Sequence, residues 1–166
     1  MKNVMPAFEF NDDNVIPAFH KEISCHMIFD IKMDLTRKAR LVAGGHMTDL
    51  PKESTYSSVA VSRDNIRIAS TLAALYDLDV LSADVQGTYL NAPTKEKVYT
   101  IAGLEFGATN VGRPVLIVWA LYGLKSSGAR WRDHMAGTLR EAGYESCKAD
   151  PDVWMKPKTK PNSEKY

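Results

Sequence analysis

The sequence has few cysteines and no long apolar run. Its two thiols, Cys25 and Cys147, lie far apart in 166 residues, which excludes a disulfide scaffold and the paired spacing of a zinc site. No stretch reaches the roughly eighteen apolar residues of a membrane span. The first residues also lack the charged start and apolar region of a signal peptide. These absences predict an intracellular protein, cytoplasmic or nuclear, that is neither secreted nor inserted in a membrane.

The chain carries almost no excess charge. Its 21 Lys and Arg residues against 20 Asp and Glu residues give a net charge of +1, so any basic surface must come from local clustering. One short stretch supplies such a cluster, with Lys32, Arg37, Lys38 and Arg40. The composition is otherwise that of an ordinary globular protein, with 45% hydrophobic and 25% charged residues.

A β-hairpin is predicted between residues 26 and 43. Apolar and polar side chains alternate over residues 26–33 and again over 37–43, on either side of the polar connection 34–36, and a period of two is typical of a half-buried strand. Lys38 and Arg40 are two residues apart, so they are expected to project from one face of the second strand. Because basic residues are also common on solvated strands, the hairpin alone leaves their role open.

Further elements follow from composition and periodicity. Residues 1–19 contain Pro6 and Pro17 without a sustained period and predict an irregular leader, and residues 46–62 predict a long polar connection. Short apolar runs predict strands at 78–85, ending near Asp84, at 98–101, at 115–119 and at 152–155. The first of these strands is expected to be buried.

Two helices are also predicted. The first starts at Ser62 or Asp64 and the second at Ser126 or Ser127, with Gly143 as the stop of the second. Each helix has an apolar stripe at three- and four-residue spacing, and both stripes are expected to be buried. The stripes consist of Ile66, Ala69, Leu72, Ala73 and Tyr76 in the first helix and of Trp131, Met135, Leu139 and Ala142 in the second.

Asp84 is the strongest candidate for a residue that takes part in chemistry. A carboxylate at the end of a buried strand can hold a divalent cation of the kind that nucleotidyl transfer uses in pairs. One carboxylate cannot hold two cations, and an isolated aspartate more often caps a turn. From the residues alone, both interpretations of Asp84 stay open.

Three sequence blocks are informative when they are taken together and in order. Residues 37–45 read RKARLVAGG, residues 82–99 read SADVQGTYLNAPTKEKVY, and residues 120–131 read ALYGLKSSGARW. These three blocks resemble those of copia-type retrotransposon reverse transcriptases. The resemblance implies an α+β fold, with the fingers and an incomplete palm of a right-hand polymerase and an antiparallel sheet packed on helices. The implied division is an irregular leader 1–19, fingers 20–78, a palm strand 79–91 with the first catalytic aspartate, a fingers return segment 92–125 and a partial palm 126–166.

The resemblance also implies roles for individual residues. Asp84 matches the first metal-binding aspartate, and the carbonyl of Val85 matches a backbone ligand for Mg²⁺. Tyr89 matches the aromatic steric gate that excludes a 2′-hydroxyl, although without the resemblance a core aromatic would be the expected reading. Lys38 and Arg40 match basic finger residues that hold the incoming triphosphate, a task that suits a rigid pair of cations.

The block from Leu121 to Gly128 matches a segment that positions template and nucleotide, with Tyr122 and Gly123 as substrate-binding residues. Gly123 would permit close approach of the backbone. A phosphate-loop motif is excluded because Leu124 stands where that pattern requires glycine before the lysine.

The implied partners are an RNA template, a DNA or RNA primer, deoxynucleoside triphosphates and the remainder of a Pol polyprotein. Two weaker constellations are expected to be structural or solvent-exposed: His20, Cys25 and His26, and Ser127, Asp133 and His134.

The family's Tyr-Xaa-Asp-Asp turn does not occur in these residues. The chain is therefore expected to be a truncated fragment that is inactive alone, because most ligands of the catalytic ions are missing. Ser58, Gly87-Thr88, Trp119 and Gly128 also depart from the family pattern and suggest a decaying copy. The alternatives are a non-catalytic nucleic-acid-binding fragment and an inert retroelement relic.

Overall fold

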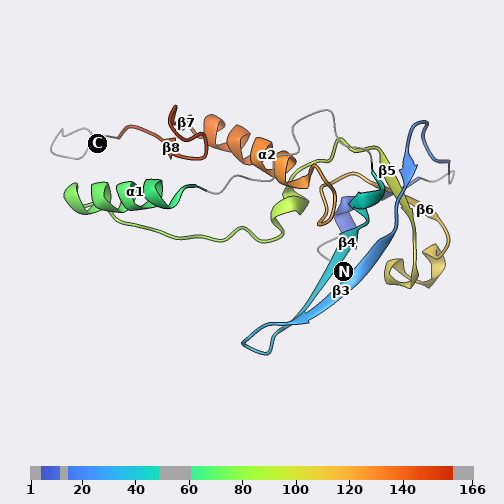
Figure 1. Cartoon of the computed structure of the whole chain (residues 1–166). Helices are drawn as coiled ribbons and strands as arrows, with labels where there is room; N and C mark the ends of the chain where they lie inside the picture. Colours follow the sequence, from blue (N-terminus) through green and yellow to red (C-terminus); the bar gives the residue numbers. More distant parts are fainter. Residues whose placement is uncertain (1–4, 12–14, 49–60, 159–166) are drawn as a thin grey trace. The chain divides into compact units, whose positions relative to one another are not determined.

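The computed structural model describes residues 5–11, 15–48 and 61–158 (Figure 1). The chain divides into two compact units, one made of Met1–Ser57 and Gly87–His134 and the other of Ser58–Gln86 and Met135–Tyr166. Residues 1–4 and 12–14 of the predicted leader, most of the predicted connection 46–62 with Ser58, and the last residues 159–166 lie outside the described part.

A four-stranded sheet forms the centre of the first unit. Its strands are β1 (Phe8–Phe10), β6 (Pro114–Ile117), β5 (Val98–Ile101) and β2 (Lys21–Glu22), in that order. β6 pairs antiparallel with both β1 and β5, whereas β2 pairs parallel with β5. The predicted strands at 98–101 and 115–119 are confirmed, although β6 ends at Ile117. The α+β fold class is confirmed as well, with two helices and mainly antiparallel pairing.

Strand β1 was not predicted, since residues 1–19 were expected to be irregular. Phe8 is buried, and its ring meets the ring of Phe106 edge-on with the centroids 4.9 Å apart. The ring of Phe10 also meets the ring of Phe106 edge-on, with the centroids 6.0 Å apart. Aromatic burial of this kind stabilises a short strand that has no clear periodicity of its own.

The predicted hairpin is confirmed as β3 (Cys25–Ile31) and β4 (Arg37–Ala43), which pair antiparallel from Cys25 opposite Ala43 to Ile31 opposite Arg37. Its turn is closed by the Asp34 carboxylate, whose Oδ1 accepts a hydrogen bond from the Thr36 amide at 3.0 Å. Figure 1 shows the hairpin projecting from the rest of its unit, with the turn at the far end. Only the base of the hairpin is buried.

One apolar cluster joins the hairpin base to the sheet. It contains residues of β1, β4, β5 and β6 and of the loop that leads into helix α2 (Ser127–Glu141). Neither α2 nor helix α1 (Arg63–Leu75) contributes a residue to this cluster. The expected packing of helices on the sheet is therefore not found in it. Its buried members are Ala7, Phe8, Ile23, Leu41, Ala43, Val98, Ala102, Phe106, Val115, Ile117, Leu121 and Leu124.

Helix α1 of the second unit begins as predicted. The Ser62 hydroxyl caps it by accepting a hydrogen bond from the Asn65 amide at 3.1 Å. The predicted burial of its apolar stripe is wrong, because Ala73 is the one buried residue of the helix and Ile66 is 55% exposed. Among the described residues, no apolar surface covers this stripe completely.

The predicted buried strand at 78–85 is also wrong. These residues have no regular secondary structure, and Leu81 is 94% exposed. A strand requires a neighbour that satisfies its backbone groups. Within the described residues no strand pairs with this segment, so its apolar composition is not sufficient to make it one.

Helix α2 is confirmed, and the chain turns at Gly143 with a φ of 83°. Two short strands follow, β7 (Glu145–Ser146) and β8 (Trp154–Met155), and they pair antiparallel. The predicted burial of the α2 stripe is wrong in part, because Met135 is exposed and Trp131 is half-buried. Short 3-10 helices cover Met5–Ala7, Gly45–Met47, Thr88–Asn91, Leu104–Phe106 and Ala108–Asn110. None of the helices in the described ranges is long and apolar enough to span a membrane.

Candidate functional site

Three predicted substrate-binding residues contact one another in the first unit. The Tyr89 and Tyr122 rings meet at 65°, with their centroids 4.8 Å apart. The guanidinium carbon of Arg40 lies 5.9 Å from the centroid of the Tyr122 ring, within the range of a cation–π contact. The three side chains come from different segments, namely β4, the 3-10 helix Thr88–Asn91 and the loop before α2. Together they form a continuous surface of one cation and two aromatic rings.

The loop that carries Tyr122 is bonded directly to the hairpin. The Ala43 amide donates to the Tyr122 carbonyl at 2.8 Å, and Val42 and Tyr122 form a parallel bridge. Gly123 has a φ of 94°, which glycine adopts readily and other residues rarely do. A Cβ atom on Gly123 would lie 2.0 Å from the Ala43 carbonyl oxygen. The close backbone approach predicted for Gly123 is thus present, but toward β4.

Polar contacts hold both ends of this loop. The Ser127 hydroxyl donates to the Leu121 carbonyl at 2.6 Å. The Lys125 ammonium donates to the Thr48 carbonyl, and the Thr48 hydroxyl donates to the Gly45 carbonyl at 2.8 Å. Lys125 therefore connects the loop to the segment after β4. The sequence did not suggest this structural role.

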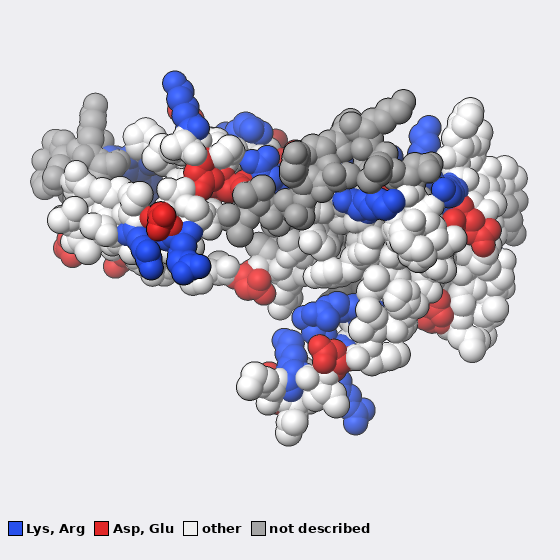
Figure 2. Space-filling model, in the orientation of Figure 1, with Lys and Arg blue, Asp and Glu red and all other residues white. Residues whose placement is uncertain are grey.

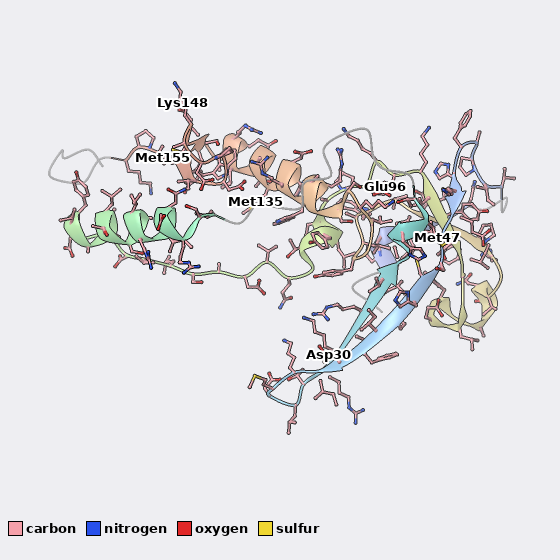
Figure 3. The ribbon with its side chains drawn as sticks, in the orientation of Figure 1. Asp30, Met47, Glu96, Met135, Lys148 and Met155 are labelled. Carbon is pink, nitrogen blue, oxygen red and sulfur yellow. The ribbon has the colours of Figure 1, made fainter. Side chains whose placement is uncertain are left out.

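Glu96, which is labelled in Figure 3, makes a further contact with the loop. Its Oε1 accepts hydrogen bonds from the Ser126 amide at 2.9 Å and from the Ser126 hydroxyl at 2.5 Å. Ser126 is the residue before the first residue of α2 and is only 4% exposed. The loop therefore has an acidic residue bonded to its last position.

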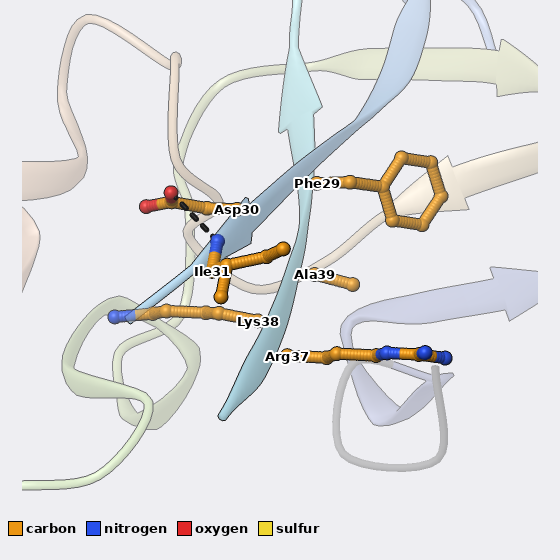
Figure 4. Close-up of a pocket in the computed structure, with 6 residues that line it drawn as sticks. All are labelled: Phe29, Asp30, Ile31, Arg37, Lys38 and Ala39. Carbon is orange, nitrogen blue, oxygen red and sulfur yellow. Dashed lines mark hydrogen bonds between the residues drawn. The ribbon is translucent and has the colours of Figure 1, made fainter. Parts of the chain in front are cut away.

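The two faces of the hairpin differ in chemistry. In Figure 4 Lys38 and Asp30 point to one side of the hairpin, whereas Phe29 and Arg37 point to the other. Residues 29–31 and 37–39 also line an open hollow of about 640 Å³. Figure 2 shows the Lys and Arg side chains that gather on this projecting arm. The predicted same-face placement of Lys38 and Arg40 agrees with the register, in which Lys38 lies opposite Asp30 and Arg40 opposite Ile28.

Neither cation of this face is neutralised by an ion pair within the described residues. Lys38 and Arg40 are both half-buried, and the nearest acidic side chain by register is Asp30. An unneutralised basic pair beside an aromatic surface can attract a phosphate group. The arrangement suits a ligand that combines an anion with a flat ring or sugar.

Asp84 and Val85 lie in the second unit, so the structure does not bring them together with the hairpin residues in one described unit. Both are exposed, in the segment without regular structure. A carboxylate and a backbone carbonyl are the hard oxygen donors that Mg²⁺ prefers. However, the described residues contain no group of three His, Cys, Asp or Glu side chains that could hold a metal ion. The donors present fit one side of a magnesium site and do not complete it.

Two shifted pKa values concern the hairpin. The hydrogen bond from the Thr36 amide lowers the pKa of the exposed Asp34 carboxyl in the turn. Burial raises the pKa of the Cys25 thiol at the base, and a hydrogen bond with Thr100 offsets part of this effect. Both shifts belong to structural positions, one in the turn and one beside the core.

Sequence reasoning missed three residues of this site. Gly45 makes the close crossing with the loop, and Glu96 and Ser126 fix the end of the loop. The Gly44-Gly45 pair could have signalled a close backbone approach. Nothing in the local sequence distinguishes Glu96 from its exposed neighbours Lys95 and Lys97, because its partner is 30 residues away.

Comparisons of the sequence with known proteins place the chain in a family. Residues 13–162 match the family described as reverse transcriptase (RNA-dependent DNA polymerase). The chain is 27% identical over 155 residues to the retrovirus-related Pol polyprotein from transposon TNT 1-94 of Nicotiana tabacum, covering 85% of this chain and 11% of that polyprotein. It is 30% identical over 131 residues to the Ty1-DR5 Gag-Pol polyprotein of Saccharomyces cerevisiae, covering 76% of this chain and 7% of that protein.

No solved structure matches the chain. The family match extends over nearly all of the sequence, and it includes the segments that supply Arg40, Tyr89 and Tyr122. The chain spans about a tenth of the polyproteins that it resembles. It therefore belongs to the reverse transcriptase (RNA-dependent DNA polymerase) family, as a copia-type Pol domain.

Proposed function

We propose that the hairpin, the Tyr89 segment and the loop with Tyr122 bind the incoming deoxynucleoside triphosphate of a copia-type reverse transcriptase. The contact of Arg40 with Tyr122, and of Tyr122 with Tyr89, supports this proposal most directly. It unites one residue from each of the three sequence blocks in a single surface. A surface of this kind offers a cation for phosphates and rings for a sugar or base.

The roles divide along this surface. Lys38 and Arg40 hold the triphosphate, because neither cation is neutralised by a carboxylate of the described chain. Tyr89 lies under the sugar and excludes a 2′-hydroxyl, and Tyr122 supports Tyr89 from the side. Gly123 keeps the loop against β4, where a Cβ atom would meet the Ala43 carbonyl oxygen. In this proposal residues 20–78 and 92–125 are fingers, and residues 79–91 and 126–166 belong to the palm.

The Asp84 carboxylate and the Val85 carbonyl would hold Mg²⁺, which, when bound, stabilises charge on the transferred phosphate. Asp84 is exposed and available for this. The 166 residues contain no Tyr-Xaa-Asp-Asp sequence, so we propose that they do not polymerise DNA by themselves. Template RNA, a primer and the rest of an intracellular Pol polyprotein are the proposed partners.

A nucleotide titration tests the proposal. Binding of a fluorescent dATP derivative is measured with Mg²⁺ and a primer–template duplex, for the wild type, Arg40→Ala and Arg37→Ala. Arg37 and Arg40 lie on the same strand with their side chains on opposite faces, so the two variants lose the same charge. Arg40→Ala is expected to weaken binding about tenfold, and Arg37→Ala to leave it nearly unchanged. Equal affinities for all three proteins would overturn the proposal.

Primer extension tests the proposed inactivity. The wild-type chain with primed RNA, deoxynucleotides and Mg²⁺ is expected to give no extended product, because the described residues offer no complete set of metal ligands. Asp84→Asn is the companion variant. A Mg²⁺-dependent product that Asp84→Asn abolishes would show that the chain is active alone.

A further inference from the structure

Glu96 makes two hydrogen bonds to a single residue of the loop that carries Tyr122. Its Oε1 accepts from the Ser126 amide at 2.9 Å and from the Ser126 hydroxyl at 2.5 Å. Bonds to a carboxylate are shorter and stronger than bonds between neutral groups. Two of them to the main chain and the side chain of one residue fix both its position and its orientation.

The other carboxylate oxygen makes this arrangement costly for stability. Glu96 Oε2 is buried and has no hydrogen-bond partner within the described residues. A buried acceptor that is left unsatisfied lowers the free energy of unfolding. Buried acceptors without a hydrogen-bond partner are expected mainly at functional positions. The cost indicates that Glu96 serves more than the stability of the fold.

The position of Glu96 links the two tyrosines of the proposed nucleotide-binding surface. The segment after Tyr89 runs beside residues 118–120, which connect β6 to the loop. There the Ala120 amide donates to the Ala92 carbonyl at 2.8 Å, and the Thr94 amide donates to the Val118 carbonyl at 3.1 Å. Glu96 then bonds to Ser126 beyond Tyr122. The loop with Tyr122 is thus attached at both ends to the segment that follows Tyr89.

We infer that Glu96 is a positioning residue that sets the contact between the Tyr122 and Tyr89 rings by holding Ser126. Its effect on nucleotide binding rests on the proposed function above, whereas its effect on the rings does not. A simpler role is helix capping, since an acidic group near the first turn of α2 interacts favourably with the helix dipole. Capping alone would change stability and leave the two rings in place.

Fluorine NMR separates these two roles. The full chain, whose seven tyrosines are replaced by 3-fluorotyrosine, gives one signal for each ring, and Tyr89→Phe and Tyr122→Phe identify the two signals of interest. The test variants are Glu96→Ala, Ser126→Ala and Glu96→Gln, and the glutamine keeps an oxygen acceptor. Glu22→Ala is the matched control, because Glu22 accepts from the Tyr99 hydroxyl at 3.0 Å and does not contact the loop.

Glu96→Ala is expected to shift or broaden the Tyr122 and Tyr89 signals and to raise the dissociation constant for dATP about tenfold. Ser126→Ala, which keeps the backbone bond, should shift the same two signals less, and Glu96→Gln should restore them. Glu22→Ala should move only the Tyr99 signal. If Glu96→Ala does not fold, Ser126→Ala decides the question in the same way.

Unmoved Tyr122 and Tyr89 signals in folded Glu96→Ala or Ser126→Ala would overturn the inference and leave helix capping as the role of Glu96. Shifted signals in a protein whose wild type does not bind dATP would support the positioning role and contradict the proposed function. The two failures are therefore distinguishable in one set of samples.

Discussion

Gly45 and Gly123 cross so closely that a Cβ atom on Gly45 would lie 1.9 Å from the Gly123 carbonyl oxygen. This crossing holds the hairpin with Arg40 against the loop with Tyr122. It depends on two glycines that lie far apart in the sequence, and on the bond from the Ala43 amide to the Tyr122 carbonyl at 2.8 Å. The relative placement of the Arg40 cation and the Tyr122 ring in the proposed nucleotide-binding surface follows from this backbone contact.

Gly45→Ala is expected to lower the free energy of unfolding by ~1–3 kcal/mol, because the added carbon forces two backbone segments apart. Chemical denaturation followed by circular dichroism measures the change. Gly137→Ala is the matched control, since a Cβ atom at Gly137 in α2 meets nothing within 4 Å. That variant should raise stability by ~0.5–1 kcal/mol, and an equal loss in both variants would contradict the close crossing.

The basic face of the hairpin predicts salt-dependent RNA binding. Lys38→Ala combined with Arg40→Ala should reduce the slope of log affinity for single-stranded RNA against log salt by ~1.4, at ~0.7 per phosphate contact. Fluorescence anisotropy at several salt concentrations measures this slope. Arg63→Ala with Arg67→Ala on α1 removes the same charge and should leave the slope nearly unchanged. An unaltered slope in the hairpin variant would exclude a contact of this face with RNA phosphates, and it would leave the proposed triphosphate contact to the nucleotide titration.

Ser62→Ala is expected to destabilise α1 by ~1 kcal/mol, because the Asn65 amide loses its hydrogen-bond acceptor at the helix start. Hydrogen exchange of the first-turn amides measures the loss. Ser70→Ala in the same helix changes a serine that only bonds back to the Ile66 carbonyl, and alanine favours a helix interior. Faster exchange in Ser70→Ala than in Ser62→Ala would contradict the capping role.

Cys25 is expected to react slowly with iodoacetamide near pH ~8, because burial raises the pKa of its thiol and leaves little thiolate at that pH. The rate is measured in Cys147→Ser, where Cys25 is the remaining thiol. Urea should increase it strongly. The raised pKa also affects stability. The free energy of unfolding should fall as the pH rises from the ordinary pKa of a thiol to the higher pKa of Cys25 in the folded protein. Equal rates for folded and unfolded protein would place Cys25 at the surface.

The sequence pattern predicts those elements that are stabilised by interactions between residues close together in the sequence. The hairpin was found because its alternation and turn lie within 19 residues, from Cys25 to Ala43. The start of α1 was found because the Ser62 cap acts three residues away. In each case the sequence window contains both partners of the interaction that stabilises the element.

The sequence pattern does not predict an element correctly where its packing partner is distant in the sequence or is absent from the described residues. Residues 78–85 have the composition of a strand but no neighbour among the described strands, and strand β1 forms through Phe106, almost a hundred residues after Phe8. The site shows the same division. The resemblance indicated Arg40, Tyr89 and Tyr122, whereas Gly45 and Glu96 gain their roles only from contacts across the fold.

Discrimination between dATP and ATP tests the central claim most directly. Competition titrations with Mg²⁺ and a primer–template duplex give the ratio of the two dissociation constants for the wild type and for Tyr89→Ala. If the Tyr89–Tyr122 surface holds the sugar, the wild type prefers dATP by about tenfold, and Tyr89→Ala largely abolishes that preference. Equal binding of dATP and ATP by the wild type, or a preference that Tyr89→Ala leaves intact, would contradict the assignment of this surface as the nucleotide pocket.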